Sequence, residues 1–599
     1  MMKLSRLYSN HPQAFRGIDF KEGFNVVLAE IRVPENRELD THNLGKTTVG
    51  ELLDFCLLKS KSGSFFLFRH EVVFHDYTFY LEVELDDGTY LNIARSVTPG
   101  TKIELKRGPE KVADASALAP GEWDHIGLPL DRAKKIVDGI LAIDALRPWG
   151  YRKLIGYLIR SQRDYLDVFQ LGKFSGSHAD WKPFVAHLLG MSAETVVNLY
   201  SKRDELGDER ARLSTLLQEW GGEDADPSVL DGLISVKRRA VEEKSHTLES
   251  FDFGAEDQRA TAEVVERTES RIVALNEERY RIAQLIVRLS ESIESEAVMF
   301  RTADSERLFN EAGVVFGDQL KRDYEQLVAF NRAITQERRA ALKQQLADAE
   351  RRTTEIDDEL PRLNFERSRS LEYLRNSESL SKYKEISREF TVIQADLKQL
   401  ESQRAAATRL IELRRQVRLL EEEYSRVQDD TETELVAISQ DEGSHFGRLR
   451  RYFTEIIHDV LGQNAILAIR INSNGGLDFV AEFVGESGIA TSGDRGTSYK
   501  KLLCIAFDLA VLRSYASVPF ARFVYHDGAL EQLEPRKRAK LIKVFRQYAE
   551  YGIQSIISAL DSDLPEPVDS SITAISEREV VLVLHDEGDA GRLFQMPSW

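Results

Sequence analysis

DTHNLGKTT, residues 40–48, is the segment from which the organisation of the whole chain can be inferred. An apolar run at 24–29 precedes it and a helical pattern at 48–58 follows it. A strand, a loop and a helix in this order are typical of a phosphate-binding loop, whose backbone N–H groups and helix N-terminus bind phosphate oxygens. Lys46 would reach the terminal phosphates and the Thr47 hydroxyl would ligate Mg²⁺. The candidate phosphate-binding residues are Asn43, Leu44, Gly45, Lys46, Thr47 and Thr48.

The first half of this motif departs from the pattern G-x-x-x-x-G-K-[ST]. The first glycine would fall at position 40, where the chain has Asp40. Residues 31–39 also read as an insertion before the phosphate-binding turn. Taken alone, the segment therefore fits a plain turn at Gly45 followed by a solvated Lys46 as well.

Composition sets limits on the class of protein. The chain has 599 residues, 30% of them charged and 42% hydrophobic, which is typical of a soluble protein of several domains. It has no run of 18 apolar residues and no apolar signal core at its start, so we expect a cytoplasmic protein that neither enters a membrane nor is secreted. The two cysteines, Cys56 and Cys504, exclude a disulfide framework and a cysteine-based zinc site within one chain. The net charge of −19 argues against indiscriminate nucleic-acid binding, while a local basic groove stays open.

The N-terminal part, residues 1–190, has a mixed α/β pattern. Alternating apolar segments lie on both sides of Asp86-Asp87-Gly88, which predicts a β-hairpin. Residues 97–130 are rich in proline, glycine and charge, and we expect loops or an insertion there.

The C-terminal part, residues 433–599, returns to a mixed pattern. A second hairpin is predicted around Asn474-Gly475-Gly476. An apolar helix at 502–512 and a strand ending in Asp527 follow, and the last residues are expected to form an exposed tail.

The middle of the chain, residues 191–432, is predicted to be a coiled-coil arm. Proline is scarce there, as long helices require. Apolar residues recur at heptad spacing among charged ones, which favours a coiled coil; a helical bundle is the alternative. The clearest series are Leu199, Leu206, Leu213 and Trp220, and Tyr383, Ile386, Phe390, Ile393, Leu397 and Leu400.

Two breaks divide this helical middle. Nearly equal lengths of helix flank the break at 302–318, which predicts an antiparallel hairpin with its apex there. In that register the break at 250–257 would lie opposite Pro361, which predicts an elbow near 250–257 and 361.

A P-loop near one end, a long coiled coil, and an aspartate-ended strand near the other end together resemble the SMC/RecN class of ABC-type ATPases. The resemblance implies an α/β head built from both chain ends, interrupted by an antiparallel coiled coil, with ATP and Mg²⁺ bound between the heads of a homodimer. Residues within 302–336 and the terminal segment also resemble an uncharacterised bacterial branch associated with anti-phage ABC three-component systems.

The resemblance assigns roles to further residues. Gln162 resembles the Q-loop glutamine that touches Mg²⁺ and senses the γ-phosphate, although a polar residue at a helix end would look the same. Gly496, Thr497 and Ser498 align with the signature motif, which binds the γ-phosphate of the opposite subunit; a helix N-cap without ligand is the alternative. Leu533-Glu534 matches the D-loop position.

Asp527 resembles the Walker B aspartate, which would hold Mg²⁺ through water, and its alternative is a turn residue. The family has its water-polarising glutamate at the next position, where this chain has Gly528. Glu531 is the nearest carboxylate that would replace it, and it equally fits a solvated acid at a helix start. The switch-loop histidine is absent near Ala559, with His526 as a candidate substitute. The predicted metal ligands are Thr47, Asp527 and Gln162.

These assignments predict an ATP-binding coiled-coil ATPase whose heads dimerise around ATP and Mg²⁺ and drive conformational change, in DNA-related bacterial defence or maintenance. Hydrolysis is expected to be slow, because a missing water-activating group costs orders of magnitude in rate. The alternative is an ATP-gated scaffold or sensor with little hydrolysis that recruits an effector protein. DNA is the usual partner of this class, but no pattern in the sequence demonstrates DNA binding, and the inferred apex carries no Cys-x-x-Cys for a shared zinc ion.

Overall fold

The computed structural model describes residues 2–36, 44–98, 102–172, 178–220, 226–251, 258–299, 318–372, 378–485, 496–564 and 575–597. The chain forms two compact units. The head unit combines Met1–Glu205 with Leu420–Trp599, and the arm unit is Leu206–Leu419. Within the described part of the chain, no helix is long and apolar enough to cross a membrane.

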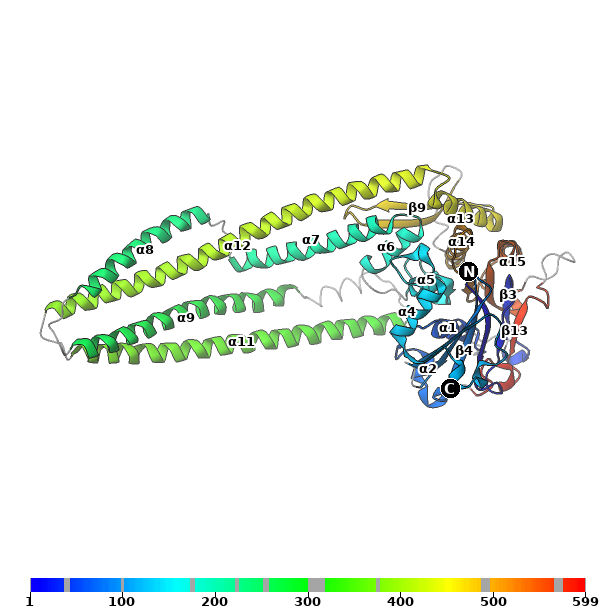
Figure 1. Ribbon diagram of the computed structural model, residues 1–599, viewed down its shortest axis with the longest axis horizontal. Coiled ribbons are helices and arrows are strands. Elements are labelled where there is room, and N and C mark those ends of the chain that lie inside the picture. The colour runs from blue at the N-terminus through cyan, green and yellow to red at the C-terminus, as the bar shows by residue number, and fades with distance from the viewer. Residues whose placement is uncertain are drawn as a thin grey trace. The chain divides into compact units, whose positions relative to one another are not determined.

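The centre of the head unit is a five-stranded sheet in which every neighbouring pair is parallel. Strands from both ends of the chain are combined in it, since β3 of the N-terminal part lies between β13 and β12 of the C-terminal part (Figure 1). Its inner strands are almost entirely buried, which explains their continuous apolar runs. In spatial order the strands are β13 (Val580–His585), β3 (Phe24–Glu30), β12 (Gln554–Leu560), β11 (Phe523–His526) and β8 (Ile159–Arg160).

A second, antiparallel sheet belongs to the same unit. The hairpin predicted at 86–88 is confirmed, since β4 pairs with β5 and Gly88 adopts a left-handed φ of 76°. The prediction of loops at 97–130 is wrong for β6 and β7. Charged and apolar residues alternate in β6, as in a strand, but the glycine, proline and charge of the whole segment obscured this pattern. In spatial order the strands are β2 (Ile18–Asp19), β1 (Met2–Ser9), β4 (Thr78–Leu85), β5 (Tyr90–Ser96), β6 (Lys102–Gly108) and β7 (His125–Pro129).

Helices complete the head unit. The apolar stretch 502–512 lies in α14 and is buried throughout, as a helix that is apolar on nearly all sides must be. The second predicted hairpin is confirmed as β9 (Asn464–Ile471) paired with β10 (Leu477–Val484). The helices are α1 (Lys46–Cys56), α2 (Phe66–Arg69), α3 (Glu71–Phe74), α4 (Leu130–Leu141), α5 (Tyr151–Leu158), α6 (His178–Leu188), α13 (His445–Leu461), α14 (Thr497–Ser514) and α15 (Pro535–Glu550).

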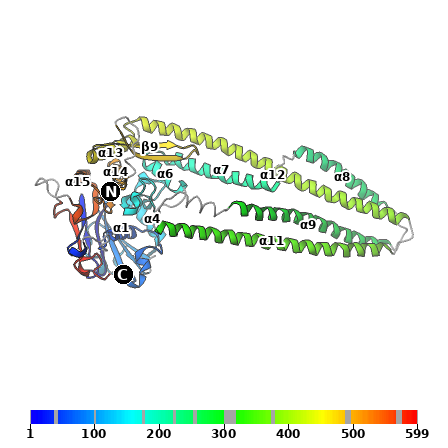
Figure 2. The ribbon, with the colours of Figure 1, turned by 180° about the vertical axis from the view of Figure 1, so that it is seen from behind.

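Long helices make up the arm unit, and α7 and α12 belong to both units. Two antiparallel pairs are visible from both sides (Figures 1 and 2): α8 with α12, and α9 with α11. Lys237 pairs with Asp396 in the first, and Arg271 pairs with Glu359 in the second. The helices are α7 (Ala193–Trp220), α8 (Pro227–Glu249), α9 (Gln258–Met299), α11 (Asp318–Glu372) and α12 (Glu378–Gln440).

The two pairs are also joined to each other within the arm unit. Lys398 of α12 pairs with Glu277 of α9 at 2.6 Å, and Gln399 donates a hydrogen bond to the Tyr280 hydroxyl. Since the same part of α12 also contacts α8, the helices of this unit lie side by side as a folded set rather than as one straight pair.

The predicted apex and elbow are only partly within the described residues. Apart from Asp318, the first residue of α11, the apex segment lies outside them, as does most of the break at 250–257. Pro361 lies inside α11, so the helix continues through that side of the predicted elbow. The elbow itself stays a prediction. The boundaries 190/191 and 432/433 stay predictions.

Candidate phosphate and carboxylate site

The first turn of α1 offers backbone donors at the carboxyl end of β3. Gly45 precedes the helix with φ 100°, and no side chain among the described residues caps it. The N–H groups of a helix start are therefore available to an anion. Asp40 and Asn43 lie outside the described residues, so their part in this site stays a prediction.

The C-terminal segment packs directly against this loop. The Leu593 amide donates a hydrogen bond to the Leu44 carbonyl at 3.0 Å, and a Cβ on Gly45 would come within 2.7 Å of the Leu593 Cβ. Leu593 and Phe594 are buried, so the expectation of an exposed tail is wrong for them. These contacts explain why only glycine fits at position 45, in both its φ and its side-chain space.

Two arginines bind the opposite end of α1. Arg95 donates to the carbonyls of Phe55 and Lys59, and Arg152 donates to that of Leu57. Burial lowers the pKa of Arg95 to about 10, a value at which the guanidinium still carries its charge at neutral pH. Cations at a helix C-terminus stabilise the helix dipole, so these two arginines stabilise α1 at the end opposite Gly45.

Asp527 lies at the carboxyl end of β11 and is fully buried. The Thr47 hydroxyl donates to its Oδ2 at 2.8 Å, and the Ser558 hydroxyl donates to its Oδ1 at 2.6 Å. Burial raises the pKa of Asp527, and the hydrogen bonds from Ser558 and Thr47 oppose that rise. The hydroxyl and the carboxylate that were predicted to ligate a metal are therefore in direct contact.

A second carboxylate lies beside this pair. Glu531 is 3.1 Å from Lys46 (Oε1 to Nζ) and accepts a hydrogen bond from the Gln162 amide at 2.8 Å through Oε2. Gln162 begins a 3₁₀ turn directly after β8, at the same edge of the central sheet. The sequence-predicted residues Lys46, Gln162 and Glu531 thus meet in space.

Gly528 explains how Glu531 reaches this place. Its φ is 62°, and a Cβ on it would lie 2.7 Å from the carboxyl carbon of Glu531. The space that a side chain at 528 would enter is therefore occupied by the Glu531 carboxyl group. The predicted pattern has glutamate at position 528, where this chain has glycine. The carboxylate of Glu531, three residues later, occupies the space beside that position.

The signature-like residues Gly496 and Ser498 lie near the end of the turn that runs from Gly528 to Gln532. Gly496 precedes α14, and no described side chain caps it. The Ser498 hydroxyl donates to the Gln532 carbonyl at 3.0 Å, whereas the side chain of Thr497 lies outside the described residues. Within one chain, Ser498 therefore contacts the end of the Gly528–Gln532 turn.

His526 does not reach the site, so its assignment as a substitute for the switch histidine is wrong. Its ring is fully buried behind Asp527, with Nε2 at 3.0 Å from Asp508. Asp508 also accepts two hydrogen bonds from the buried guanidinium of Arg160. Ser558 of β12 bonds both Asp527 and the Gly528 amide, so it is the polar side chain that reaches the site instead.

Comparisons with known proteins found one family model and several solved structures that are similar to this chain. A family model described as an uncharacterised protein conserved in bacteria (DUF2326) matches residues 456–598. No curated protein matches the chain.

Among solved structures, the chain is similar to the Smc head domain with a coiled coil and joint derived from Pyrococcus yayanosii, with 14% identity over 93% of this chain and 92% of that one, and a TM-score of 0.33. It is also similar to the Smc head domain with an extended coiled coil from Pyrococcus furiosus, crystallised with the C-terminal domain of ScpA, with 11% identity over 94% and 91% of the chains and a TM-score of 0.31.

The matched family region contains Asp527 and Glu531, whereas Lys46, Thr47 and Gln162 lie outside it. Sequence reasoning also missed three polar residues around the site: Ser558, Lys501 and Asp508. Ser558 and Asp508 are polar side chains inside an otherwise apolar strand and helix, which is the signal that could have identified them. Lys501 follows the polar start of α14 and carries no such signal.

Proposed function

We propose that this protein binds ATP with Mg²⁺ at the α1 start and hydrolyses it, with Glu531 as the water-activating carboxylate. The observation that carries this proposal is the meeting of Glu531 with Lys46 and Gln162 beside the Thr47–Asp527 pair. A lysine, a hydroxyl, two carboxylates and free helix amides are the donor set that a nucleotide phosphate with a hard cation requires.

The described residues suit this ligand on two grounds. The amides of the first turn of α1 have no described side-chain cap, and Thr47 and Asp527 supply the hard oxygen atoms that Mg²⁺ prefers. Mg²⁺ bound with the nucleotide would offset the negative charge of the phosphate oxygens.

Lys46 and Glu531 would change partners on binding. Phosphate oxygens compete with Glu531 Oε1 for the Lys46 ammonium, so Oε1 is released to accept a proton from water. Gln162 donates to Oε2 and would orient the carboxylate during that step.

The decisive experiment compares wild type with Lys46→Ala and with Lys543→Ala, whose lysine is exposed and has no ion pair among the described residues. Phosphate release is measured with ATP and Mg²⁺, and nucleotide affinity by calorimetry. We expect Lys46→Ala to lose turnover about 100-fold or more, as for a removed preorganised donor, and Lys543→Ala to match wild type. Wild type that binds ATP without turnover would contradict hydrolysis and leave the ATP-gated scaffold.

We further propose that two heads associate around the nucleotide. The uncapped start of α14 at Gly496 would bind the phosphate held by Lys46 of a second chain. Sedimentation of Glu531→Gln, which is expected to retain its nucleotide, measures this association. A monomer both with and without ATP would contradict it.

DNA and an effector protein are the partners that the resemblance implies, in bacterial defence or maintenance. Titration with duplex DNA at two salt concentrations, with and without ATP, tests the first; absence of binding in every nucleotide state would exclude it.

A further inference from the structure

Lys501 is a buried cation that the proposed chemistry does not use. It lies in the second turn of α14 and is 6% exposed. Its Nζ donates to the carbonyl of Gly528 at 2.7 Å and to the carbonyl of Glu531 at 3.1 Å. The ammonium also lies 5.3 Å from the centre of the Tyr165 ring. Both ends of the turn that carries Glu531 are therefore bonded to one side chain.

Burying this ammonium is costly. Loss of hydration lowers the pKa of Lys501, and attraction to Glu531 and Asp527 opposes that effect. The next two residues of the helix, Leu502 and Leu503, are buried without such a cost. A charged residue at this point indicates that its hydrogen bonds serve the turn beside it.

The turn needs support from outside. Gly528 and Gln532 both have left-handed φ values, 62° and 63°. Such a backbone is strained for a residue with a Cβ such as Gln532. Within the turn, the Glu531 amide donates to the Gly528 carbonyl at 3.2 Å, a long hydrogen bond. The two bonds from Lys501 strengthen the connection between the same two residues.

The helix that carries Lys501 is itself fixed against the site. Two turns further along α14, Asp508 accepts bonds from Arg160 of β8 at 2.6 and 2.8 Å. The signature-like residues form the start of α14. The position of this helix therefore determines where both those residues and the Lys501 ammonium lie.

We propose that Lys501 is a positioning residue for hydrolysis: by binding the carbonyls of Gly528 and Glu531, it sets the Glu531 carboxylate in its reactive place. This inference rests on the proposed function. It adds α14 to the parts of the head unit that control the Glu531 carboxylate, beside Lys46 and Gln162.

The test measures kcat and KM for ATP in Lys501→Met, which keeps the apolar stem, and in Lys501→Arg, which keeps the charge and donors. Lys543→Met is the matched control, and thermal melting checks that each variant folds. Misplacing a catalytic group by about 1 Å can cost on the order of 100-fold, so we expect Lys501→Met to lower kcat at least ~10-fold while KM changes less than ~2-fold. Lys501→Arg should recover part of the loss.

A double-variant comparison separates positioning from general damage. In single-turnover reactions, Lys501→Met should add no further loss to Glu531→Gln, because both act through one carboxylate. An unchanged kcat in Lys501→Met, or losses that multiply in the double variant, would overturn the inference. If the wild-type protein shows no turnover that depends on Lys46, the proposed function is overturned as well. This outcome differs from failure of the inference alone, in which wild type hydrolyses ATP and Lys501→Met does so equally fast.

Discussion

The head site and the arm use the same charged residue types in opposite ways. Arg160 and Asp508 of the head are both fully buried, and Arg160 also donates to carbonyls of Asp164, Asp167 and Val168. In the arm, Arg238 and Glu401 pair at 2.6 Å with 61% and 39% of their side chains exposed. A buried pair is costly to break because the remaining charge has no water, whereas exposed pairs contribute little.

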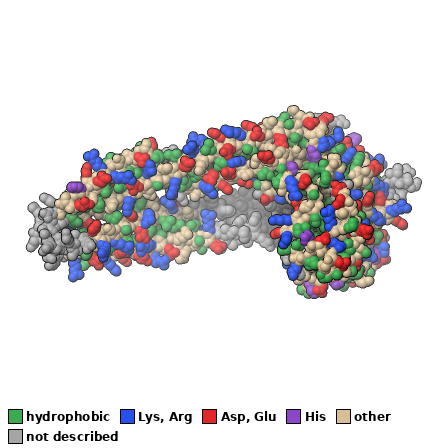
Figure 3. Space-filling model, viewed as in Figure 1, with side chains coloured by type: hydrophobic (Ala, Val, Ile, Leu, Met, Phe, Trp, Pro, Cys, Tyr) green, Lys and Arg blue, Asp and Glu red, His purple; other side chains and the backbone are tan. Residues whose placement is uncertain are grey.

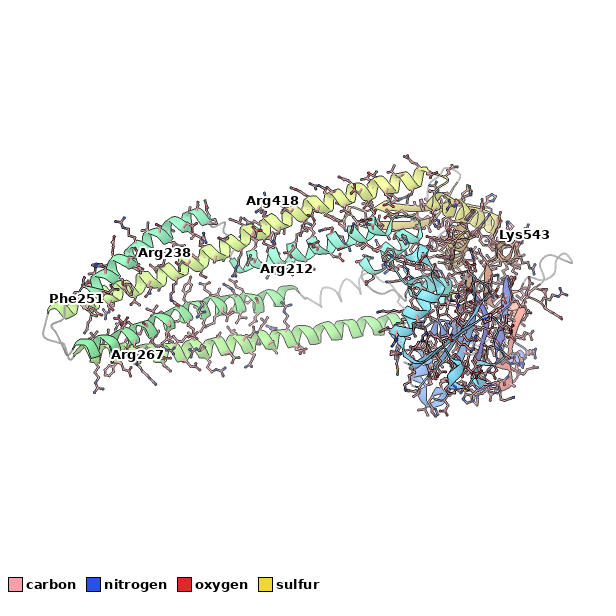
Figure 4. All side chains as sticks on the ribbon, in the orientation of Figure 1. Arg212, Arg238, Phe251, Arg267, Arg418 and Lys543 are labelled. Atoms are coloured by element: carbon pink, nitrogen blue, oxygen red, sulfur yellow. The ribbon has the colours of Figure 1, made fainter. Side chains whose placement is uncertain are left out.

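The surface of the arm carries many further exposed charges of both signs. Lys and Arg side chains alternate with Asp and Glu along the helices (Figure 3), and Arg212, Arg238 and Arg418 project from them (Figure 4). Opposite charges along exposed helices are typical of coiled coils, whereas the head unit also buries charged side chains such as Arg160 and Asp508.

The largest effect is expected from breaking the buried pair in the head. Arg160→Met leaves the Asp508 carboxylate without its main partner, and we expect a loss of about 3–5 kcal/mol in the free energy of unfolding. Urea unfolding followed by fluorescence measures it, since Trp123, Trp149 and Trp181 all lie in the head unit.

The control is the double variant Arg160→Met with Asp508→Leu, which removes both charges. It should be clearly more stable than Arg160→Met alone. Equal stability of the two would mean that the unpaired carboxylate is not the cause of the loss.

Acid should destabilise the head through His445. Burial lowers the pKa of this imidazole to about 4, and the charges of Arg448 and His187 act in the same direction. The unfolded chain, with a pKa near 6.5, then binds more protons between pH 6.5 and 4, so stability falls as pH falls, by up to about 3 kcal/mol across that window. His445→Gln should flatten the slope of unfolding free energy against pH; an unchanged slope would assign it to other groups.

A smaller change in stability is expected at Gly528. Alanine there would force a left-handed residue to carry a Cβ, at about 1–2 kcal/mol, and would displace the Glu531 carboxyl group. Turnover should therefore fall more than stability does, measured by phosphate release and urea unfolding of Gly528→Ala. Gly552→Ala, at φ 75° with open space around its Cβ, is the matched control for backbone strain alone. Equal turnover in the two variants would contradict a specific effect on Glu531.

Much of the fold follows from local patterns in the sequence. The hairpins at 86–88 and 474–476 carry glycine where a left-handed turn requires it, and apolar runs identify the buried parallel strands. The strands β6 and β7 were missed because the glycine, proline and charge in and around them indicated loops, and α11 continues through Pro361.

Site residues that belong to a local sequence motif could be predicted. Residues that reach the site only through the packing of distant segments were harder to predict. Lys46, Thr47 and Asp527 are recognisable from spacing, and Glu531 was found as the nearest carboxylate. Lys501 acts through carbonyls that any residue could carry, so no spacing rule identifies it.

The smallest effect is expected in the arm, and it completes the comparison with Arg160. Arg238→Ala removes an exposed pair with Glu401, which should cost less than about 1 kcal/mol because water solvates both charges after the change. Helix content at 222 nm during urea unfolding reports on the arm, whose long helices dominate that signal. The residual effect should also shrink at high salt, since exposed charges are screened there. A loss as large as that of Arg160→Met, insensitive to salt, would mean that the folded set of arm helices depends on this pair and that the contrast between head and arm does not hold.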